Sequence, residues 1–307
     1  MKFDLHRLQL LRELSRLGTV SAVADTLSYS TSSISQQLAV LETEIGTPLL
    51  VPDGRRVRLT PQAEILVKHT GAVLMQLEGA EAEISSSLGS VVGVVRFATI
   101  QTAALSCVPE MLSRLSHTHP DLRVQVTLAE PDIAIPGLLT REFDLVCDEM
   151  YPEHTAVRSR DTHLDSVAED PMRVAFREPP AGVSAAGVSL ADFAEHPWVM
   201  ELPGSPGREW SVAACRRAGF EPRVEHQTSD NLVQAELVAR GLAVAFLPDL
   251  LWFGRKPSFH LRWMEPTHVR SLVTTCRAGS QDNPAITTVR DAFADAFEIS
   301  RPDVVDR

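Results

Sequence analysis

Cysteine is scarce in this chain, and long apolar runs are absent. The four cysteines are widely scattered and form no CxxC pair, so neither a disulfide framework nor a zinc ribbon is indicated. No stretch approaches the roughly 18 consecutive apolar residues that span a membrane. The opening MKFDLHRLQL also lacks the apolar core of a signal peptide. We therefore expect a cytoplasmic protein with reduced thiols and no membrane contact; a thiol-based redox role stays open.

The usual signatures of catalysis are missing as well. The chain contains no nucleophile elbow, no glycine-rich phosphate loop and no HExxH motif. His117 and His119 resemble a metal pair, but no third ligand stands nearby and they lie at what reads as a helix end. The sequence therefore predicts neither an enzyme nor a bound metal or cofactor.

The charge is acidic and unevenly distributed. The formal net charge is −11 over 307 residues, which argues against a chain coated with nucleic acid along its length. Residues 1–60 carry seven basic and six acidic side chains, a net charge of +1, so the rest of the chain carries −12. This split is expected if only the N-terminal end meets a polyanion.

Three short helices are predicted at the N-terminus of a chain long enough for two domains. Asp4 can cap the first helix and Gly18 can end it. The second runs from Val20 to Leu27, with apolar residues at helical spacing. After the turn SYS, Ser30 is a good cap for the third. Two short amphipathic helices joined by a three-residue turn predict a helix-turn-helix.

Small polar residues form the exposed face of the third predicted helix. In a helix-turn-helix, the N-terminal residues of the second helix enter the major groove of DNA. Serine and threonine can bond several base edges there, and glutamine can pair with adenine through two hydrogen bonds. A capped, solvated helix start without such a role is the alternative. The residues predicted to meet DNA are Ser30, Thr31, Ser32, Ser35 and Gln36.

A basic hairpin is predicted directly after these helices. In LLVPDGRRVRLT, residues 49–60, two apolar runs flank Asp53-Gly54, which is a hairpin signal. Arg55 and Arg56 stand beside the turn, at the tip of a wing that could grip phosphates or enter the minor groove. A helix-turn-helix followed at once by a basic-tipped hairpin is more specific than either feature alone. We therefore predict a winged DNA-binding domain over residues 1–60; a small solvated bundle is the alternative.

A long helix is predicted from Thr60-Pro61 to about Leu88. Its apolar residues recur at heptad spacing, which is typical of a helix that pairs with its copy in a second subunit. A single helix packed on its own domain is the alternative. We assign residues 61–90 to a linker and dimerisation helix, with contacts from Leu66, Val73, Leu77, Ala80 and Ile84.

The segment LRELSRLGTVSAVADTLSYSTSSISQQLAVLETEIGTPLL, followed by GRRVRLTPQAE, resembles the LysR-type transcriptional regulator family. The resemblance covers nearly the whole chain and is strongest over residues 4–64. It implies a winged helix-turn-helix, a dimerising linker helix and a C-terminal effector domain folded like a periplasmic binding protein. It also implies dimers or tetramers that bind interrupted inverted repeats near promoters, contact RNA polymerase and respond to a small metabolite.

This chain departs from the family pattern within the predicted reading helix. The family often has Gln-Pro where this chain has Thr31-Ser32, and often has arginine at the position of Gln36. The absence of that arginine removes a strong guanine or phosphate contact, so the preferred base sequence is expected to differ. The positions carried over from the family are Thr31, Ser32, Ser35 and Gln36 for bases, and Arg55 or Arg56 for the wing.

Strand and helix patterns alternate after residue 90, which predicts α/β structure with a mostly parallel sheet. The fold class is therefore α/β overall: an N-terminal all-α winged helix-turn-helix, a long linker helix and a two-lobed, periplasmic-binding-protein-like effector domain. We place that domain at residues 91–300, with lobe I at 91–163 and 267–300, lobe II at 164–266, and a tail at 301–307.

Ligands of such sheets sit beyond the carboxyl ends of the strands. Several residues at these strand ends are acidic, which favours an effector with a cationic or donor-rich group. Alternatively, the carboxylates are solvated, or paired with Arg158 or Arg208. The predicted effector-binding residues are Thr99, Gln101, Thr102, Glu130, Asp148, Glu201, Gly204, Ser205, Thr228, Asp230 and Phe246.

Two functions fit these patterns. The first is a sequence-specific DNA-binding transcriptional regulator whose promoter binding is modulated by a small molecule held between the lobes. The alternative is a cytoplasmic small-molecule-binding protein without a base-specific DNA role. The predicted winged domain favours the first.

Overall fold

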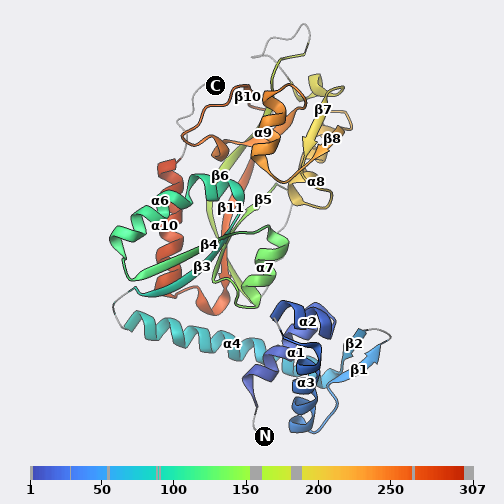
Figure 1. Ribbon diagram of the computed structural model, residues 1–307, viewed down its shortest axis with the longest axis vertical. Coiled ribbons are helices and arrows are strands. Elements are labelled where there is room, and N and C mark those ends of the chain that lie inside the picture. Colours follow the sequence, from blue (N-terminus) through green and yellow to red (C-terminus); the bar gives the residue numbers. More distant parts are fainter. Residues whose placement is uncertain are drawn as a thin grey trace.

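The computed structural model shows a small helical head, one long helix and an elongated α/β body (Figure 1). It describes residues 3–27, 29–53, 56–87, 89, 91–152, 161–180, 189–264 and 267–300. The statements below concern these residues.

The head contains the three predicted helices, α1 (Leu5–Leu17), α2 (Val20–Leu27) and α3 (Thr31–Ile45). The carboxylate of Asp4 accepts a hydrogen bond from the backbone N–H of Arg7 at 3.2 Å and caps α1, as expected. Gly18 ends α1 in the left-handed conformation, with φ of 75°. The core of the head is apolar and joins all three helices to the start of the next one; it includes Leu10, Leu11, Leu14, Val23, Ile34, Leu38, Leu41 and Ala63.

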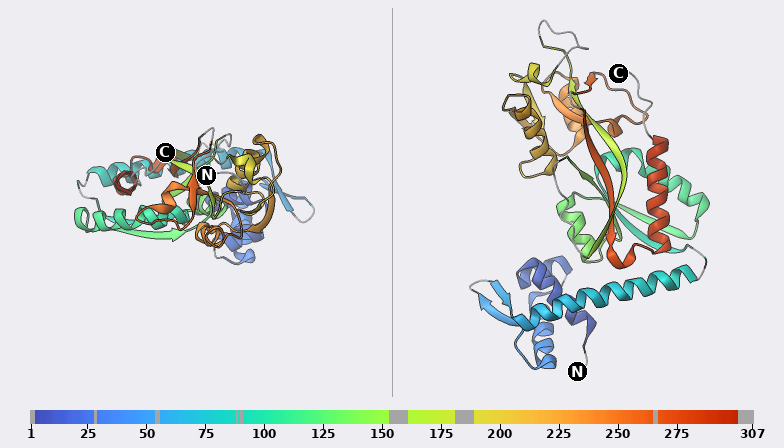
Figure 2. Two further views of the ribbon diagram at one scale, coloured as in Figure 1. Left: turned by 90° about the horizontal axis from the view of Figure 1, so that it is seen from above. Right: turned by 180° about the vertical axis from the view of Figure 1, so that it is seen from behind.

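A two-stranded antiparallel hairpin and a long helix follow. The hairpin consists of β1 (Leu50–Asp53) and β2 (Arg56–Leu59). Helix α4 (Pro61–Ser87) then crosses the end of the α/β body, as Figure 1 and the right view of Figure 2 show. The predicted hairpin and the predicted long helix are therefore both present.

The body begins with a lobe that contacts α4. Its first strand β3 (Gly93–Thr99) is followed by α5 (Gln101–Ser106) and α6 (Val108–Thr118), and its final helix is α10 (Pro284–Ser300). The rings of Phe97 and Phe293 meet edge to face between β3 and α10. The remaining elements of this lobe are β4 (Leu122–Leu128), α7 (Pro131–Leu139), β5 (Leu145–Met150) and the 3-10 turn η4 (Ala278–Ser280).

Two long strands join the lobes. They are β6 (Thr162–Phe176) and β11 (His268–Arg277), which pair with each other antiparallel. The second lobe adds η2 (Leu190–Phe193), β7 (Pro197–Met200), α8 (Pro206–Arg217), β8 (Arg223–Gln227), α9 (Asn231–Ala239), β9 (Ala245–Pro248), η3 (Asp249–Trp252) and β10 (His260–Arg262). The lobe boundary expected between residues 163 and 164 falls inside β6, so the lobes share continuous strands.

The expectation of a mostly parallel sheet is wrong. The main sheet has the order β10–β6–β11–β5–β3–β4, and β9 also pairs with β6. Only the β3–β4 and β3–β5 pairs in it are parallel. The pairs made by β6 and β11 are antiparallel, because one strand leaves the first lobe and the other returns to it.

Candidate DNA-binding surface and effector cleft

Helix α3 presents its N-terminal turns to solvent. Ser30 caps it by accepting a hydrogen bond from the backbone N–H of Ser33 at 3.1 Å. Ile34, Leu38 and Leu41 are buried on the opposite face and fix the helix against the head. The exposed face consists of Thr31, Ser32, Ser35, Gln36 and Ala39.

This face has the chemistry that base edges require. The hydroxyls of Ser30 and Ser32 lie 3.0 Å apart. Within the described part of the chain, the amide of Gln36 is exposed and makes no side-chain hydrogen bond, so its donor and acceptor are free for a partner. The residues predicted to meet DNA therefore share one exposed surface.

The hairpin is anchored to α3 by a carboxylate that sequence patterns do not single out. Glu42 accepts hydrogen bonds from the backbone N–H groups of Leu49, at 2.7 Å, and Leu50, at 3.0 Å. This contact fixes where the hairpin starts relative to α3. Arg55 lies outside the described residues, and Arg56 is described only as part of β2.

A small pocket lies between the lobes, where β3, β4 and β5 end. Gln101 spans it, since its side-chain oxygen accepts a hydrogen bond at 2.9 Å from the backbone N–H of Asn231 in the second lobe. The pocket is lined by Ile100, Gln101, Thr102, Glu130, Glu149, Glu201, Ser229 and Asn231.

A buried arginine organises the floor of this cleft. Arg270, in β11, is 1% exposed and forms an ion pair at 2.7 Å with Asp170 of β6. It also pairs with Glu149 of β5 and donates to the hydroxyl of Thr102 at 2.8 Å. Tyr151 donates to Glu149 at 3.0 Å. Because Arg270 is already paired with two carboxylates, its charge only partly offsets burial and charge repulsion at the other acids of the cleft.

The remaining acids hold protons more tightly than free carboxyls do. Burial raises the pKa of Asp148 to about 7, helped by the charges of Glu149 and Glu130. Burial also raises the pKa of Glu201 to about 7, with a further contribution from Glu149. The pKa of Glu130 is raised by burial and by Glu149 and Asp132. The cleft is therefore an electrostatically unfavourable place for a simple anion.

The pH dependence of unfolding should report these shifts. The folded pKa values of Asp148 and Glu201 exceed the unfolded ones, so their contribution to stability is present below the ordinary carboxyl pKa and is lost as the pH rises through about 7. Since one pKa unit is about 1.4 kcal/mol, Asp148→Asn should raise the free energy of unfolding at pH 8 by roughly 2–4 kcal/mol, and the gain at pH 5 should be smaller by about 2–3 kcal/mol. Denaturant titrations at both pH values measure this. Glu110→Gln on α6 is the exposed control, and equal effects of Asp148→Asn at both pH values would contradict the prediction.

The structure brings together only part of the predicted effector set. Four members line the pocket: Gln101, Thr102, Glu130 and Glu201. Others lie beside it: Ser205 donates to Glu201 at 2.7 Å, and Asp230 caps α9 next to Asn231. Those that do not line it are Thr99, Asp148, Gly204, Ser205, Thr228, Asp230 and Phe246.

Two of the predicted residues are buried away from any ligand. Phe246 packs between Trp198 and Trp210 in the core of the second lobe. Thr99 is fully buried at the end of β3. The expectation that ligands sit beyond the carboxyl ends of strands selects both residues. It gives a position along the strand but does not distinguish the two faces of the sheet. Their burial argues against contact of either side chain with an effector.

Of the two arginines expected as alternative partners for the acids, only Arg208 lies among the described residues. Arg158 lies outside the described residues. Arg208 donates to the backbone oxygen of Glu201 at 3.0 Å, and no hydrogen bond or ion pair from it to the carboxylate is formed within the described residues. Arg270, which lies in an apolar-looking strand, was missed.

Three further observations concern the cysteine thiols, membrane-spanning helices and clusters of metal-binding side chains. All four thiols are buried and none forms a disulfide within the described residues, and burial raises the pKa of Cys215 to about 12 and that of Cys276 to about 11. None of the helices in the described part of the chain combines the length and hydropathy that a membrane crossing requires. The described residues hold no cluster of metal-binding side chains.

One face of α4 is apolar and is left exposed by the residues that the structure describes. Leu77 is 44% exposed and Ile84, seven positions later, is 62% exposed; Val73 and Ala80, also seven positions apart, are exposed as well. Leu66 instead packs partly against the core of the head. The exposed face is thus shorter than the predicted seam.

Comparison with known proteins identifies both parts of the chain. Residues 5–64 match the family model of the bacterial regulatory helix-turn-helix protein, lysR family. Residues 89–298 match the LysR substrate binding domain. The transcriptional dual regulator GltC of Bacillus subtilis is 24% identical over 84% of this chain and 85% of its own length. The regulator IlvY of Escherichia coli is 26% identical over 81% of this chain and 82% of its own.

Solved structures share the same fold. A full-length OxyR variant from Pseudomonas aeruginosa aligns with a TM-score of 0.68 at 18% identity, over 100% of this chain and 99% of its own. Full-length CbnR in complex with its target DNA aligns with a TM-score of 0.53 at 19% identity, over 96% of this chain and 100% of its own. At these identities the likeness concerns the fold alone.

Proposed function

The chain belongs to the LysR family and is a DNA-binding transcriptional regulator with a C-terminal effector-binding domain, and we propose that α3 is the helix that reads its operator. The observation that carries this proposal is the exposed polar face of α3, set opposite a buried apolar stripe. Because Ser32 and Ser35 are small, the backbone of α3 can approach the groove floor closely. The proposed base-contacting residues are Thr31, Ser32, Ser35 and Gln36, with Ser30 as the cap.

Substitution of Gln36 tests this role. Gln36→Ala should weaken binding to the preferred operator by roughly 1–3 kcal/mol and relax base preference at one position of each half-site. Gln37, one residue later, bonds Arg7 at 2.9 Å and is only half exposed, so Gln37→Ala is a matched control. Titration of single-base operator variants by fluorescence anisotropy, at one stated salt concentration, measures both effects. Equal base preference in Gln36→Ala and the parent would contradict the assignment.

We further propose that α4 pairs with its copy in a second subunit. The exposed apolar row from Val73 to Ile84 supports this, since the described part of the chain leaves it uncovered. A dimer would present two reading helices to an interrupted inverted repeat near a promoter, and two dimers would form a tetramer. Light scattering of the full-length protein tests the pairing: two or four copies support it, and a single copy contradicts it.

We also propose that the effector binds in the interlobe cleft and carries a cationic or donor-rich group. The lining contributes the carboxyls of Glu130, Glu149 and Glu201, whereas Arg270 is already paired. Thermal shifts with butylammonium and with butyrate provide a matched comparison. Stabilisation by the amine class supports the proposal, and stabilisation by carboxylates alone contradicts it. Contact with RNA polymerase, in the cytoplasm where operators are found, completes the proposed function.

A further inference from the structure

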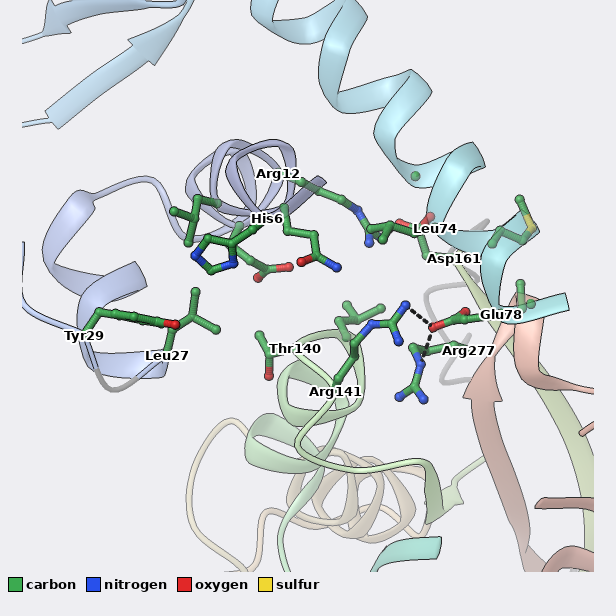
Figure 3. A pocket seen from close by; sticks show the side chains of 18 residues that line it. His6, Arg12, Leu27, Tyr29, Leu74, Glu78, Thr140, Arg141, Asp161 and Arg277 are labelled. Atoms are coloured by element: carbon green, nitrogen blue, oxygen red, sulfur yellow. Dashed lines mark hydrogen bonds and ion pairs between the residues drawn. The ribbon is translucent and has the colours of Figure 1, made fainter. Parts of the chain in front are cut away.

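A buried carboxylate fastens the linker helix to the first lobe. Glu78 of α4 is 6% exposed, although it lies on a helix whose other acids are exposed. Arg277 donates to it from Nε at 2.7 Å, and Arg141 pairs with it at 3.0 Å. Figure 3 shows both arginines converging on Glu78 from the side of the lobe, at the edge of a cavity between head, linker and lobe. We refer to Glu78, Arg141 and Arg277 as the clamp.

The lobe and the linker helix approach each other closely beside this contact. Arg141 adopts the left-handed conformation, with φ of 68°, which costs a non-glycine residue free energy and requires the surroundings to maintain it. Gly279 of η4 lies against α4, and a Cβ built there would collide with the carbonyl oxygen of Met75. A second ion pair, between Arg12 of α1 and Asp161, spans 2.9 Å on the side of the head. The contact between linker and lobe is therefore close and specific.

The clamp and the effector cleft lie at opposite ends of the same two strands. Strands β5 and β11 pair antiparallel, with Leu145 opposite Cys276 and Met150 opposite Ser271. At the cleft end, Arg270 of β11 pairs with Glu149 of β5. At the clamp end, the next residues along the chain are Arg277 of β11 and Asp144, which pair at 3.1 Å. Arg277 lies seven positions after Arg270 along the strand, a distance of about 23 Å at the usual rise per residue.

We infer that Glu78, gripped by Arg141 and Arg277, is the positioning residue that transmits the state of the cleft to the linker helix. The inference rests on the proposed function, because it assumes that a ligand perturbs the Glu149–Arg270 end. When a ligand perturbs the Glu149–Arg270 pair, β5 shifts relative to β11. Because Asp144 is paired with Arg277 at the other end of these strands, the same shift moves Arg277 relative to Glu78. Helix α4 carries the head, so its angle to the lobe sets the separation of the two reading helices in a dimer.

Substitution of Glu78 can be tested without leaving a buried arginine unpaired. Arg277 keeps Asp144 and also donates to the backbone oxygens of Leu138, at 3.0 Å, and Phe143, at 2.6 Å. Arg141 is partly exposed and can be solvated. Glu78→Gln should therefore fold. Glu83→Gln is the matched control, since Glu83 lies exposed on the same helix and the change in net charge is the same.

The first measurement is amide hydrogen exchange in the full-length protein. Glu78→Gln should accelerate exchange in residues 74–82 and 278–280 by about tenfold, because a charge-assisted contact that holds α4 on the lobe is lost. Glu83→Gln should leave those rates unchanged. Equal exchange in both variants would show that the clamp does not hold the helix.

The second measurement separates transmission from a purely structural role. Glu149→Gln, which alters the cleft end of β5, should change exchange in residues 74–82 in the parent and should have no such effect in the Glu78→Gln background. An unchanged rate after Glu149→Gln alone, or the same change in both backgrounds, would overturn the inference. Operator binding by the parent protein is measured in a separate titration, whereas the exchange experiment uses no DNA. A failure of transmission is therefore distinguishable from a failure of DNA recognition.

Discussion

Replacement of Arg270 by methionine should destabilise the effector domain by about 3–5 kcal/mol. Arg270 is 1% exposed and provides the charge that compensates buried Asp170. Removing it leaves that carboxylate without a cation in a low-dielectric interior, since the other bond to Asp170 comes from the backbone N–H of Leu250 at 2.9 Å. Chemical denaturation followed through the tryptophans, which all lie in the second lobe, measures the effect.

The control variants identify the cause of that loss. Arg270→Met combined with Asp170→Asn should recover much of the lost free energy of unfolding, because removing both charges of a buried pair is often close to neutral. Arg216→Met removes an ion pair with Glu221 whose side chains are both 64% exposed, and it should change stability little. If Arg270→Met unfolds at the same denaturant concentration as the parent, Arg270 does not hold the cleft together.

Substitution of Ser32 by glutamate should reduce operator affinity by about 100-fold or more, because like charges brought together at an interface cost several kcal/mol. Ser32 is exposed in the first turn of α3, where the proposed contact with DNA is closest. A carboxylate there meets the phosphates and holds the helix away from the groove floor. The helix itself should remain folded, since acidic residues stabilise helix N-termini.

The matched control for this variant is Ser113→Glu, on the exposed surface of α6 in the first lobe. It changes the net charge by the same amount and should leave operator affinity close to that of the parent. Electrophoretic mobility shifts at near-physiological salt compare the three proteins. A Ser32→Glu protein that binds as tightly as Ser113→Glu would remove α3 from the interface.

Local patterns predicted the head well because its structure depends on neighbours in the chain. The caps of α1 and α3, the buried residues Ile34, Leu38 and Leu41, and the glycine that ends α1 all follow from spacing over a few residues. Turn chemistry at Asp53-Gly54 likewise predicted the hairpin. Base contacts, pairing of α4 and effector contacts stay predictions, since a single chain does not contain the partners.

Contacts between residues far apart in the chain could not be predicted from sequence patterns. Arg270 meets Asp170, 100 positions earlier, and a strand that reads HVRSLVTTCR does not show which carboxylates it will face. The antiparallel course of β6 and β11 depends on the chain returning to its first lobe, which periodicity does not encode. Asp148 and Glu149 both stand at the end of β5, and alternation along the strand does not say which of the two acids faces the cleft.

The central claim is that a dimer of this protein reads a paired operator through α3. The most direct test is selection of genomic DNA fragments by the purified full-length protein at near-physiological salt. The account predicts enrichment of one motif, made of two inverted half-sites separated by a fixed spacer. Enrichment of fragments that share no motif, or of an unpaired half-site, would contradict it.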